Sequence, residues 1–351
     1  MPEPAETYPL SVIPGYHASR PGIQVGTKLP GNATEEDVRF IRQLGVEWVM
    51  AGVSAPDQHT AEHYTALRRW AESFGLRVYR LANHRCHNME EVTLNLPGRD
   101  DKIREYLAYI RNLGKAGIHY ATYAHMANGI WSTDREAIRG GATARAFHIE
   151  EARTGHWASK AYQAPLTHGR RYSEEELWDN YGFFIRQVVP VAEDAGVFIG
   201  IHPDDPPVYD LGGVPRCIFG TFEGYKRAIE MADSPNIGMC LCVGCWLEGG
   251  AMMGKDVLET IRYFAHQRKL FKVHFRNVTA PMPSGFAETF LDDGYMNMHQ
   301  VMRTLREVGY DGAVMSDHLE DMVGGPCAAE AYAVGYMKAL VQSVNEEFGG
   351  V

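Results

Sequence analysis

The sequence predicts a single (β/α)8 barrel over residues 1–351, and three features support this prediction. Eight short apolar segments recur along the chain, and most are followed by a stretch with helical periodicity. Strand and helix alternating over eight units favour a closed barrel of parallel strands, and such barrels often exceed about 250 residues. No G-x-G-x-x-G segment follows the first strand, which argues against a dinucleotide-binding sheet.

The first half of the chain contains four predicted strands separated by helical stretches. We expect the strands at residues 22–26, 46–51, 76–81 and 118–123, and helices at residues 61–74 and 101–115. Another helix begins near Thr34, whose side chain can serve as the N-cap, with Asp37 at the third helical position. Gly75 is placed to end a helix before the third strand.

Residues 127–172 interrupt this alternation. The segment is rich in Gly, Arg, His and Trp and has no clear periodicity. Segments of this length are uncommon in compact domains unless they serve a function or are disordered. We expect an insertion after the fourth strand that covers the C-terminal face of the barrel as a lid, because the βα loops lie at that face. The alternative is a disordered excursion, although Trp131, Phe147 and Trp157 argue against disorder throughout.

Regular structure returns at Ser173–Glu176, which matches a capping box. The helix that begins there is expected to end near residue 195. Four further strands are predicted at residues 197–201, 236–242, 270–275 and 312–315. The helices between and after these strands are predicted at residues 222–231, 257–267, 298–308 and 328–344.

The last four predicted strands each end at a residue that can bind a metal ion. All strand C-termini of such a barrel open onto one face, so side chains far apart in sequence can converge there. A mixed set of imidazole, thiolate and carboxylate suits Zn²⁺, Mn²⁺ or Fe²⁺ better than Ca²⁺ or Mg²⁺. The four predicted ligands are His202, Cys242, His274 and Asp317.

Neighbouring residues leave alternatives open. Cys240, Cys242 and Cys245 could form a zinc knuckle, but no second pair of Cys or His stands at finger spacing. Small buried core residues are the other alternative for Cys240 and Cys242. Asp204 and Asp205 could orient a metal-bound imidazole, or they could serve as turn residues before proline.

Other polar residues near the strand ends are candidates for the substrate site. Arg276 shares a strand face with His274 and could clamp a carboxylate, or it could pair with an aspartate of the chain. Asn277 follows Arg276 directly, and Arg216 is a second candidate clamp. His318 follows a predicted ligand and titrates near neutrality, which suits general acid–base chemistry. Tyr332 could contribute a phenol from the last helix, or it could simply pack there.

Composition and charge narrow the class of partner. The formal net charge is −10, so nucleic acid and anionic membrane surfaces are poor partners, whereas a small anionic substrate can meet a local cation. No apolar run is long enough to cross a membrane. The first six residues lack a basic region followed by an apolar one, so we expect a cytoplasmic protein without a signal peptide.

Several segments resemble the mannonate dehydratase family, which has a barrel of the xylose-isomerase-like type. The resemblance is carried by Ile201–Pro207, Met239–Gly244, His274–Asn277, Met296–Met298 and Ser316–His318. It implies a divalent ion, most often Mn²⁺, with Fe²⁺ or Zn²⁺ as alternatives. It also implies His202, Cys242, His274 and Asp317 as ligands and His318 and Tyr332 as acid–base residues. Residues 130–134 are similar to a Trp-containing loop of the family, which makes Trp131 a substrate-binding candidate. We also expect a homo-oligomer.

The sequence departs from the family pattern at three places. Met315 stands where the family has arginine, Leu319 stands where it has glycine, and Ala51–Gly52–Val53 replaces a histidine pair. The resemblance therefore transfers the metal chemistry and leaves the particular sugar acid open.

The function that follows is a dehydratase acting on D-mannonate or a related aldonate by β-elimination, giving a 2-keto-3-deoxy acid. His318 and Tyr332 would share the removal of the α proton and the protonation of the leaving hydroxyl, in an order that the sequence does not assign. Two alternatives remain at this stage. One is a metal-dependent sugar isomerase or epimerase, and the other is a barrel that binds metal or sugar without catalysis.

Overall fold

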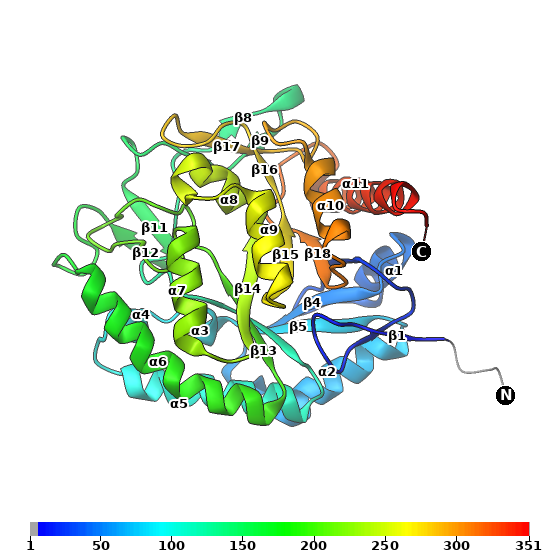
Figure 1. Cartoon of the computed structure of the whole chain (residues 1–351), viewed down its shortest axis with the longest axis horizontal. Helices are drawn as coiled ribbons and strands as arrows, with labels where there is room; N and C mark the ends of the chain where they lie inside the picture. Colours follow the sequence, from blue (N-terminus) through cyan, green and yellow to red (C-terminus); the bar gives the residue numbers. More distant parts are fainter. Residues whose placement is uncertain (1–5, 351) are drawn as a thin grey trace.

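The computed structural model describes residues 6–350, and these residues form a barrel of eight parallel strands (Figure 1). Neighbouring strands follow the order β5–β4–β3–β18–β15–β14–β13–β6. A parallel bridge between Asn88 and Ala124 joins the two ends of this order, just past β5 and at the end of β6. The strand bounds are β3 (Gln24–Lys28), β4 (Trp48–Val53), β5 (Arg77–Asn83), β6 (Tyr120–Ala124), β13 (Phe198–His202), β14 (Ile237–Cys242), β15 (Leu270–Phe275) and β18 (Ala313–Ser316). The barrel predicted from the sequence is confirmed.

The long helices pack around the outside of the strands (Figure 1). They are α1 (Glu35–Gln43), α2 (Ala61–Ser73), α5 (Arg99–Lys115), α6 (Glu174–Ala195), α7 (Phe222–Ala232), α9 (Val257–His266), α10 (Met298–Glu307) and α11 (Gly325–Glu347). The shorter helices are α3 (His84–His87), α4 (Glu90–Thr93) and α8 (Val243–Gly249), and these were not predicted. Among the described residues, no helix is long and apolar enough to cross a membrane.

The helix boundaries follow local chemistry in the way the sequence predicted. The Thr34 side chain accepts a hydrogen bond from the Asp37 N–H, and the Asp37 carboxylate accepts one from the Thr34 N–H. Ser173 and Glu176 form the same reciprocal arrangement at the start of α6. Gly196 ends α6 with a φ of 62°, a left-handed conformation that costs glycine little.

Alternation along the strands divides the core into an outer and an inner part. On β4, Val49 and Ala51 belong to the large cluster shared with the helices, whereas Trp48 and Met50 belong to a smaller cluster inside the barrel. The smaller cluster includes Tyr16, which follows β1 (Tyr8–Pro9) and precedes β2 (His17–Ala18). The Tyr16 hydroxyl donates to the Tyr79 carbonyl at 2.7 Å. This hairpin therefore packs under the N-terminal end of the barrel, and the polar inward residues gather toward the other end.

Residues 127–172 form short strands that pair with one another and with the segment after β15. These are β7 (Ile130–Trp131), β8 (Glu136–Ala137), β9 (Thr143–Ala144), β10 (Ala146–Phe147), β11 (Thr154–Trp157) and β12 (Lys160–Gln163). β10 pairs with β17 (Phe286–Thr289), which also pairs with β16 (Asn277–Val278). The Trp131 N–H donates to the Asp205 carbonyl, just beyond β13. The segment is thus ordered around the residues that follow β13 and β15.

Candidate active site at the strand ends

Four side chains at the ends of successive strands come together inside the barrel. Each offers one ligand atom, and all four atoms lie within 4.8 Å of one another; the residues are His202, Cys242, His274 and Asp317. His274 Nδ1 is 3.1 Å from His202 Nε2 and 3.3 Å from Asp317 Oδ1. The Cys242 sulfur is 3.4 Å from Asp317 Oδ2. We refer to these four residues as the ligand group.

Hydrogen bonds orient the two imidazoles. His202 Nδ1 lies 2.7 Å from the Pro203 carbonyl oxygen. Because a carbonyl only accepts hydrogen bonds, Nδ1 carries the proton, and Nε2 keeps its lone pair toward the ligand group. His274 turns Nδ1 toward the group, and its Nε2 lies 2.8 Å from Lys272 Nζ. The His202 ring is therefore held with one nitrogen available to an ion, whereas His274 Nδ1 is available only when Nε2 carries the ring proton and Lys272 Nζ accepts from it.

The surroundings favour the charged forms of the two acidic ligands. Burial acts to raise the pKa of the Cys242 thiol, but hydrogen bonding with Cys245 and the Arg276 guanidinium hold it well below its usual value. Burial likewise acts to raise the pKa of Asp317, and the nearby His274, His318 and Arg276 outweigh that effect. A thiolate and a carboxylate are the forms in which these residues bind metals.

The cysteine cluster is divided between separate surroundings. Cys242 is the N-cap of α8, and its sulfur accepts the Cys245 N–H at 3.4 Å. Cys245 itself lies with Asp205 and Glu248. The Cys240 sulfur lies 3.8 Å from His274 Nε2, on the side away from the ligand group. Within the described residues, no group of close ligand atoms contains two of these cysteines.

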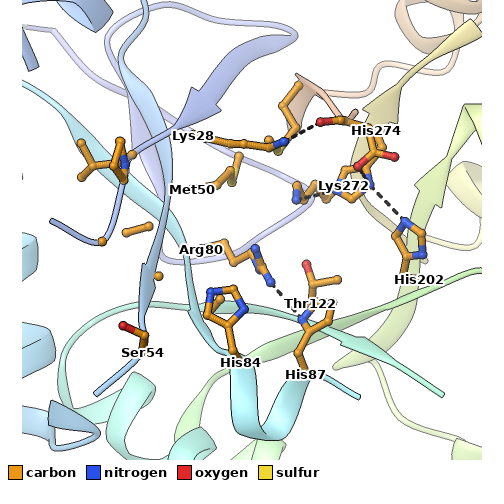
Figure 2. Close-up of a pocket in the computed structure, with 18 of the residues that line it drawn as sticks. Lys28, Met50, Ser54, Arg80, His84, His87, Thr122, His202, Lys272 and His274 are labelled. Carbon is orange, nitrogen blue, oxygen red and sulfur yellow. Dashed lines mark hydrogen bonds and ion pairs between the residues drawn. The ribbon is translucent and has the colours of Figure 1, made fainter. Parts of the chain in front are cut away.

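The ligand group borders a cavity of about 740 Å³ (Figure 2). His202, His274 and Asp317 line one side of it, together with His318. Much of the remaining wall comes from β3, β4, β5 and the loops that follow them, with Lys272 on β15, Thr122 on β6, and Ile130 and Trp157 of the 127–172 segment. Its polar side chains include Lys28, Arg80, His84, His87, Thr122 and Lys272. A small substrate can therefore reach the ligand group and a wall with basic side chains at the same time.

His318 is held by a carboxylate that the sequence did not indicate. His318 Nδ1 lies 2.7 Å from Glu288 Oε1, on β17, and 2.7 Å from Arg276 Nη1, so a carboxylate acceptor and a guanidinium donor both meet this nitrogen. Burial acts to lower the pKa of His318, but the Glu288 and Asp317 carboxylates raise it above the usual value. Glu288 lies in the segment after β15, which has no pattern that would mark it in the sequence.

Arg276 and Arg145 lie beside the site in a buried charge network. Arg276 Nη2 is 2.7 Å from Glu248 Oε1, and Nη1 is 2.7 Å from Glu288 Oε1 and 3.3 Å from Asp205 Oδ2. Arg145, from the 127–172 segment, contacts the same three carboxylates. Burial and Asp205 raise the pKa of Glu248 to about 8, so it is protonated at neutral pH. Two guanidinium groups then face the ionised Asp205 and Glu288 carboxylates, and Arg276 also lies 3.4 Å from Asp317 Oδ2.

The four candidate substrate-binding residues form hydrogen bonds or ion pairs with other residues of the protein. Within the described structure none of them lines the cavity. Arg276 serves the network just described. Asn277 donates to the Leu291 and Met296 carbonyls at 3.1 and 2.9 Å. Arg216 donates to the Gly129 carbonyl at 2.7 Å, and Trp131 donates to Asn128 at 3.3 Å.

The two predicted acid–base residues have different surroundings. His318 lines the cavity, whereas Tyr332 is not among its lining residues as the structure describes them. Tyr332 lies on α11, and its hydroxyl hydrogen-bonds to Asp292, which also pairs with Arg139. Direct participation of Tyr332 would require its hydroxyl to leave Asp292.

The basic wall was missed by the sequence reasoning. Lys272 precedes His274 by two residues and therefore shares its strand face, a signal that could have been used. Arg80 lies three residues before the end of β5, between the apolar pairs Val78–Tyr79 and Leu81–Ala82. Charged residues inside apolar strands mark positions that face a polar interior.

The fold and the site together define a class of protein. The parallel eight-stranded barrel is the fold of the xylose-isomerase-like barrels. The crystal structure of a xylose isomerase domain protein from Planctomyces limnophilus has this fold, with a TM-score of 0.58 and 15% identity over 93% of this chain and 98% of that one.

A family model described as D-mannonate dehydratase (UxuA) matches residues 31–348, and the chain belongs to this family of hydro-lyases. The mannonate dehydratase of Streptococcus equi subsp. zooepidemicus is 31% identical over 325 residues, which cover 87% of each chain. Mannonate dehydratase 2 of Halalkalibacterium halodurans is 26% identical, over 88% of this chain and 94% of that protein. The crystal structure of the Streptococcus suis serotype 2 mannonate dehydratase matches with a TM-score of 0.79 and 26% identity, covering 95% of this chain and 96% of that one. The resemblance noted in the sequence is confirmed.

Proposed function

We propose that this protein is a metal-dependent dehydratase that removes water from D-mannonate or a related aldonate and forms a 2-keto-3-deoxy acid. The observation that carries the proposal is the ligand group itself, four ligand-type atoms within 4.8 Å beside a cavity that His318 also lines. The names of the relatives support the reaction type.

The donor set fits a divalent transition metal. Two imidazoles, a thiolate and a carboxylate suit Mn²⁺, Fe²⁺ or Zn²⁺, and Mn²⁺ is our proposal. The orientation of His202 by the Pro203 carbonyl is a further feature that fits, because it leaves a lone pair directed at the group. A divalent ion held there supplies Lewis acidity that makes the α C–H bond of a bound sugar acid more acidic.

His318 is the residue that we propose for proton transfer. Glu288 lies against its Nδ1 and, with Asp317, raises the pKa of His318, which favours a ring that carries a proton to donate. Tyr332 remains the second candidate, for the protonation of the leaving hydroxyl, with its hydroxyl released from Asp292. We further propose that residues 127–172 act as a lid, since Arg145 and Trp131 of this segment bond to residues beside the site.

We propose that Arg276, Asn277, Arg216 and Trp131 support the substrate site without contacting the substrate. Each is bonded within the protein, and we propose that they hold the loops around the cavity in place. A cytoplasmic location and a homo-oligomer stay predictions.

The reaction is tested with manganese-loaded protein and D-mannonate. The expected product lacks the mass of one water and is a 2-keto-3-deoxy acid. A product of unchanged mass would instead indicate an isomerase or epimerase, and bound metal without turnover on a broad aldonate panel would indicate a binding protein.

The proton-transfer role is tested with His318→Asn and a matched surface control, His299→Asn on α10. The first variant should keep its metal and lose about a hundredfold or more in turnover, the usual scale for a positioned acid–base group. The control should retain full activity, because His299 pairs with Glu347 away from the cavity. Normal turnover in His318→Asn would remove this residue from the mechanism. Tyr332→Phe removes only the hydroxyl and tests the second candidate in the same way.

A further inference from the structure

The cavity has a second polar feature besides the ligand group. Lys28, Arg80 and Lys272 come from three strands, β3, β5 and β15, and all three line the same space. Figure 2 shows them directed into the cavity that His202 and His274 border. We refer to these three residues as the basic wall.

Among the described residues, no carboxylate forms an ion pair with any member of the basic wall. Lys28 donates to the Asp317 backbone carbonyl, and Arg80 Nη2 lies 2.9 Å from His87 Nδ1. Lys272 is 1% exposed and contacts His274 Nε2. The Arg80 Nε–H is buried without any hydrogen-bond partner. Unpaired cationic groups and an unused donor in a cavity favour an anionic ligand.

The carboxylates that line the cavity are already committed. Asp205 is held by Arg145 and Arg276, and Asp317 belongs to the ligand group. A divalent ion in the ligand group would have its charge balanced by the Cys242 thiolate and the Asp317 carboxylate. Lys272 lies near the Cys240 thiol and Asp317, which balance its charge, so Lys28 and Arg80 carry the positive charge left for the substrate, and one carboxylate offers only a single negative charge.

We propose that the basic wall binds a second anionic group of the substrate, beside the ligand group and toward Arg80, which contacts no member of that group. The substrate would then be a sugar acid that carries a terminal carboxylate or phosphate in place of a terminal hydroxyl. This inference rests on the proposed function, because it assumes that the sugar acid occupies this cavity.

The test uses three acids that differ only at the sixth carbon: D-mannonate, its dicarboxylate D-mannarate, and 6-phospho-D-mannonate. Binding to manganese-loaded protein is measured by calorimetry, and turnover is measured separately. We expect one of the two doubly anionic acids to bind at least tenfold more tightly than D-mannonate. Tighter binding of D-mannarate identifies a carboxylate, and tighter binding of the phosphorylated acid identifies a phosphate. The preference should shrink as ionic strength rises.

Substitutions in the basic wall test which residues give the preference for a doubly anionic acid over D-mannonate. Arg80→Gln and Lys28→Gln should each weaken binding of the doubly anionic acid more than binding of D-mannonate and so remove most of this preference. Arg80→Lys should retain part of it. Arg77→Gln is the matched control, since Arg77 lies on the same strand but pairs with Glu47 outside the cavity. Lys28 is exposed at the end of β3, so its variant should fold normally even if an Arg80 variant does not.

Two results would overturn the inference: equal affinity for all three acids, or an equal loss for all three in both Gln variants. The second result would mean that the wall binds the single carboxylate of an aldonate. Dehydration of D-mannonate with no preference for a second anionic group would leave the proposed function intact. Tight binding of a doubly anionic acid without any dehydration would remove the proposed function and leave the subsite.

Discussion

Replacing Arg276 by methionine should destabilise the protein far more than the same change at an exposed arginine. Arg276 has a side chain 2% exposed, and its guanidinium contacts Asp205, Glu248 and Glu288. Methionine preserves much of the apolar stem but leaves the buried acids with Arg145 as their only shared cation. Removing one partner from a buried ionic network typically costs about 3–5 kcal/mol.

The size of the effect should follow burial across three arginines. Arg145 contacts the same carboxylates with 11% of its side chain exposed, so Arg145→Met should cost less, about 1–3 kcal/mol. Arg139 is 44% exposed and pairs with Asp292, so Arg139→Met should cost about 0–1 kcal/mol. With an m-value of about 3 kcal/mol/M for urea, Arg276→Met should lower the denaturation midpoint by about 1–1.7 M.

Urea unfolding followed by circular dichroism measures the three midpoints under one condition. Metal content and the D-mannonate assay on the same samples show whether the network also supports the site. Equal midpoint shifts in Arg276→Met and Arg139→Met would refute the argument that burial sets the cost. A shift below about 0.3 M in Arg276→Met would show that the acids are neutralised by protonation instead.

Three further predictions concern the pH dependence, the metal and the packing. Glu248 has its pKa raised to about 8, so its contribution to stability is full below its unfolded pKa near 4.5 and is lost as the pH rises toward 8. The stability of Glu248→Gln relative to wild type should therefore grow between pH 5 and pH 8. Unfolding midpoints of the two proteins that change in parallel over this pH range would contradict the prediction. Cys242→Ala should lose most of its bound manganese in elemental analysis while keeping its circular dichroism spectrum, and full occupancy would exclude Cys242 as a ligand. Gly244→Ala should destabilise the folded protein by about 1–3 kcal/mol, because the added methyl would overlap the Arg276 side chain. Gly335→Ala lies in the middle of α11, where the added carbon meets no described atom within 4 Å outside the helix backbone, and it should stabilise the protein by about 0.5–1 kcal/mol. Thermal melts of both variants measure the two changes.

Much of the barrel was predictable because its causes are local. Apolar segments of strand length separated by amphipathic helices specify the alternation, and the capping side chains of Thr34 and Ser173 mark helix starts within three residues. The convergence of His202, Cys242, His274 and Asp317 was also predictable, since every strand of a parallel barrel ends at the same face. Barrel closure alone brings such residues together, whatever the loops do.

The partners of those residues depended on the tertiary structure. Glu288 reaches His318 only because β17 folds back beside β16 and β10, and nothing in the sequence near residue 288 indicates that path. Arg276 lies where a substrate clamp was expected, yet three carboxylates from separate loops surround it. The sequence by itself determined the alternation of strands and helices and the convergence of the four predicted ligands at the C-terminal face. Loop paths decided which charges were paired within the protein and left the basic wall without a carboxylate partner among the described residues, because electrostatic pairing acts through space between segments that sequence spacing does not relate.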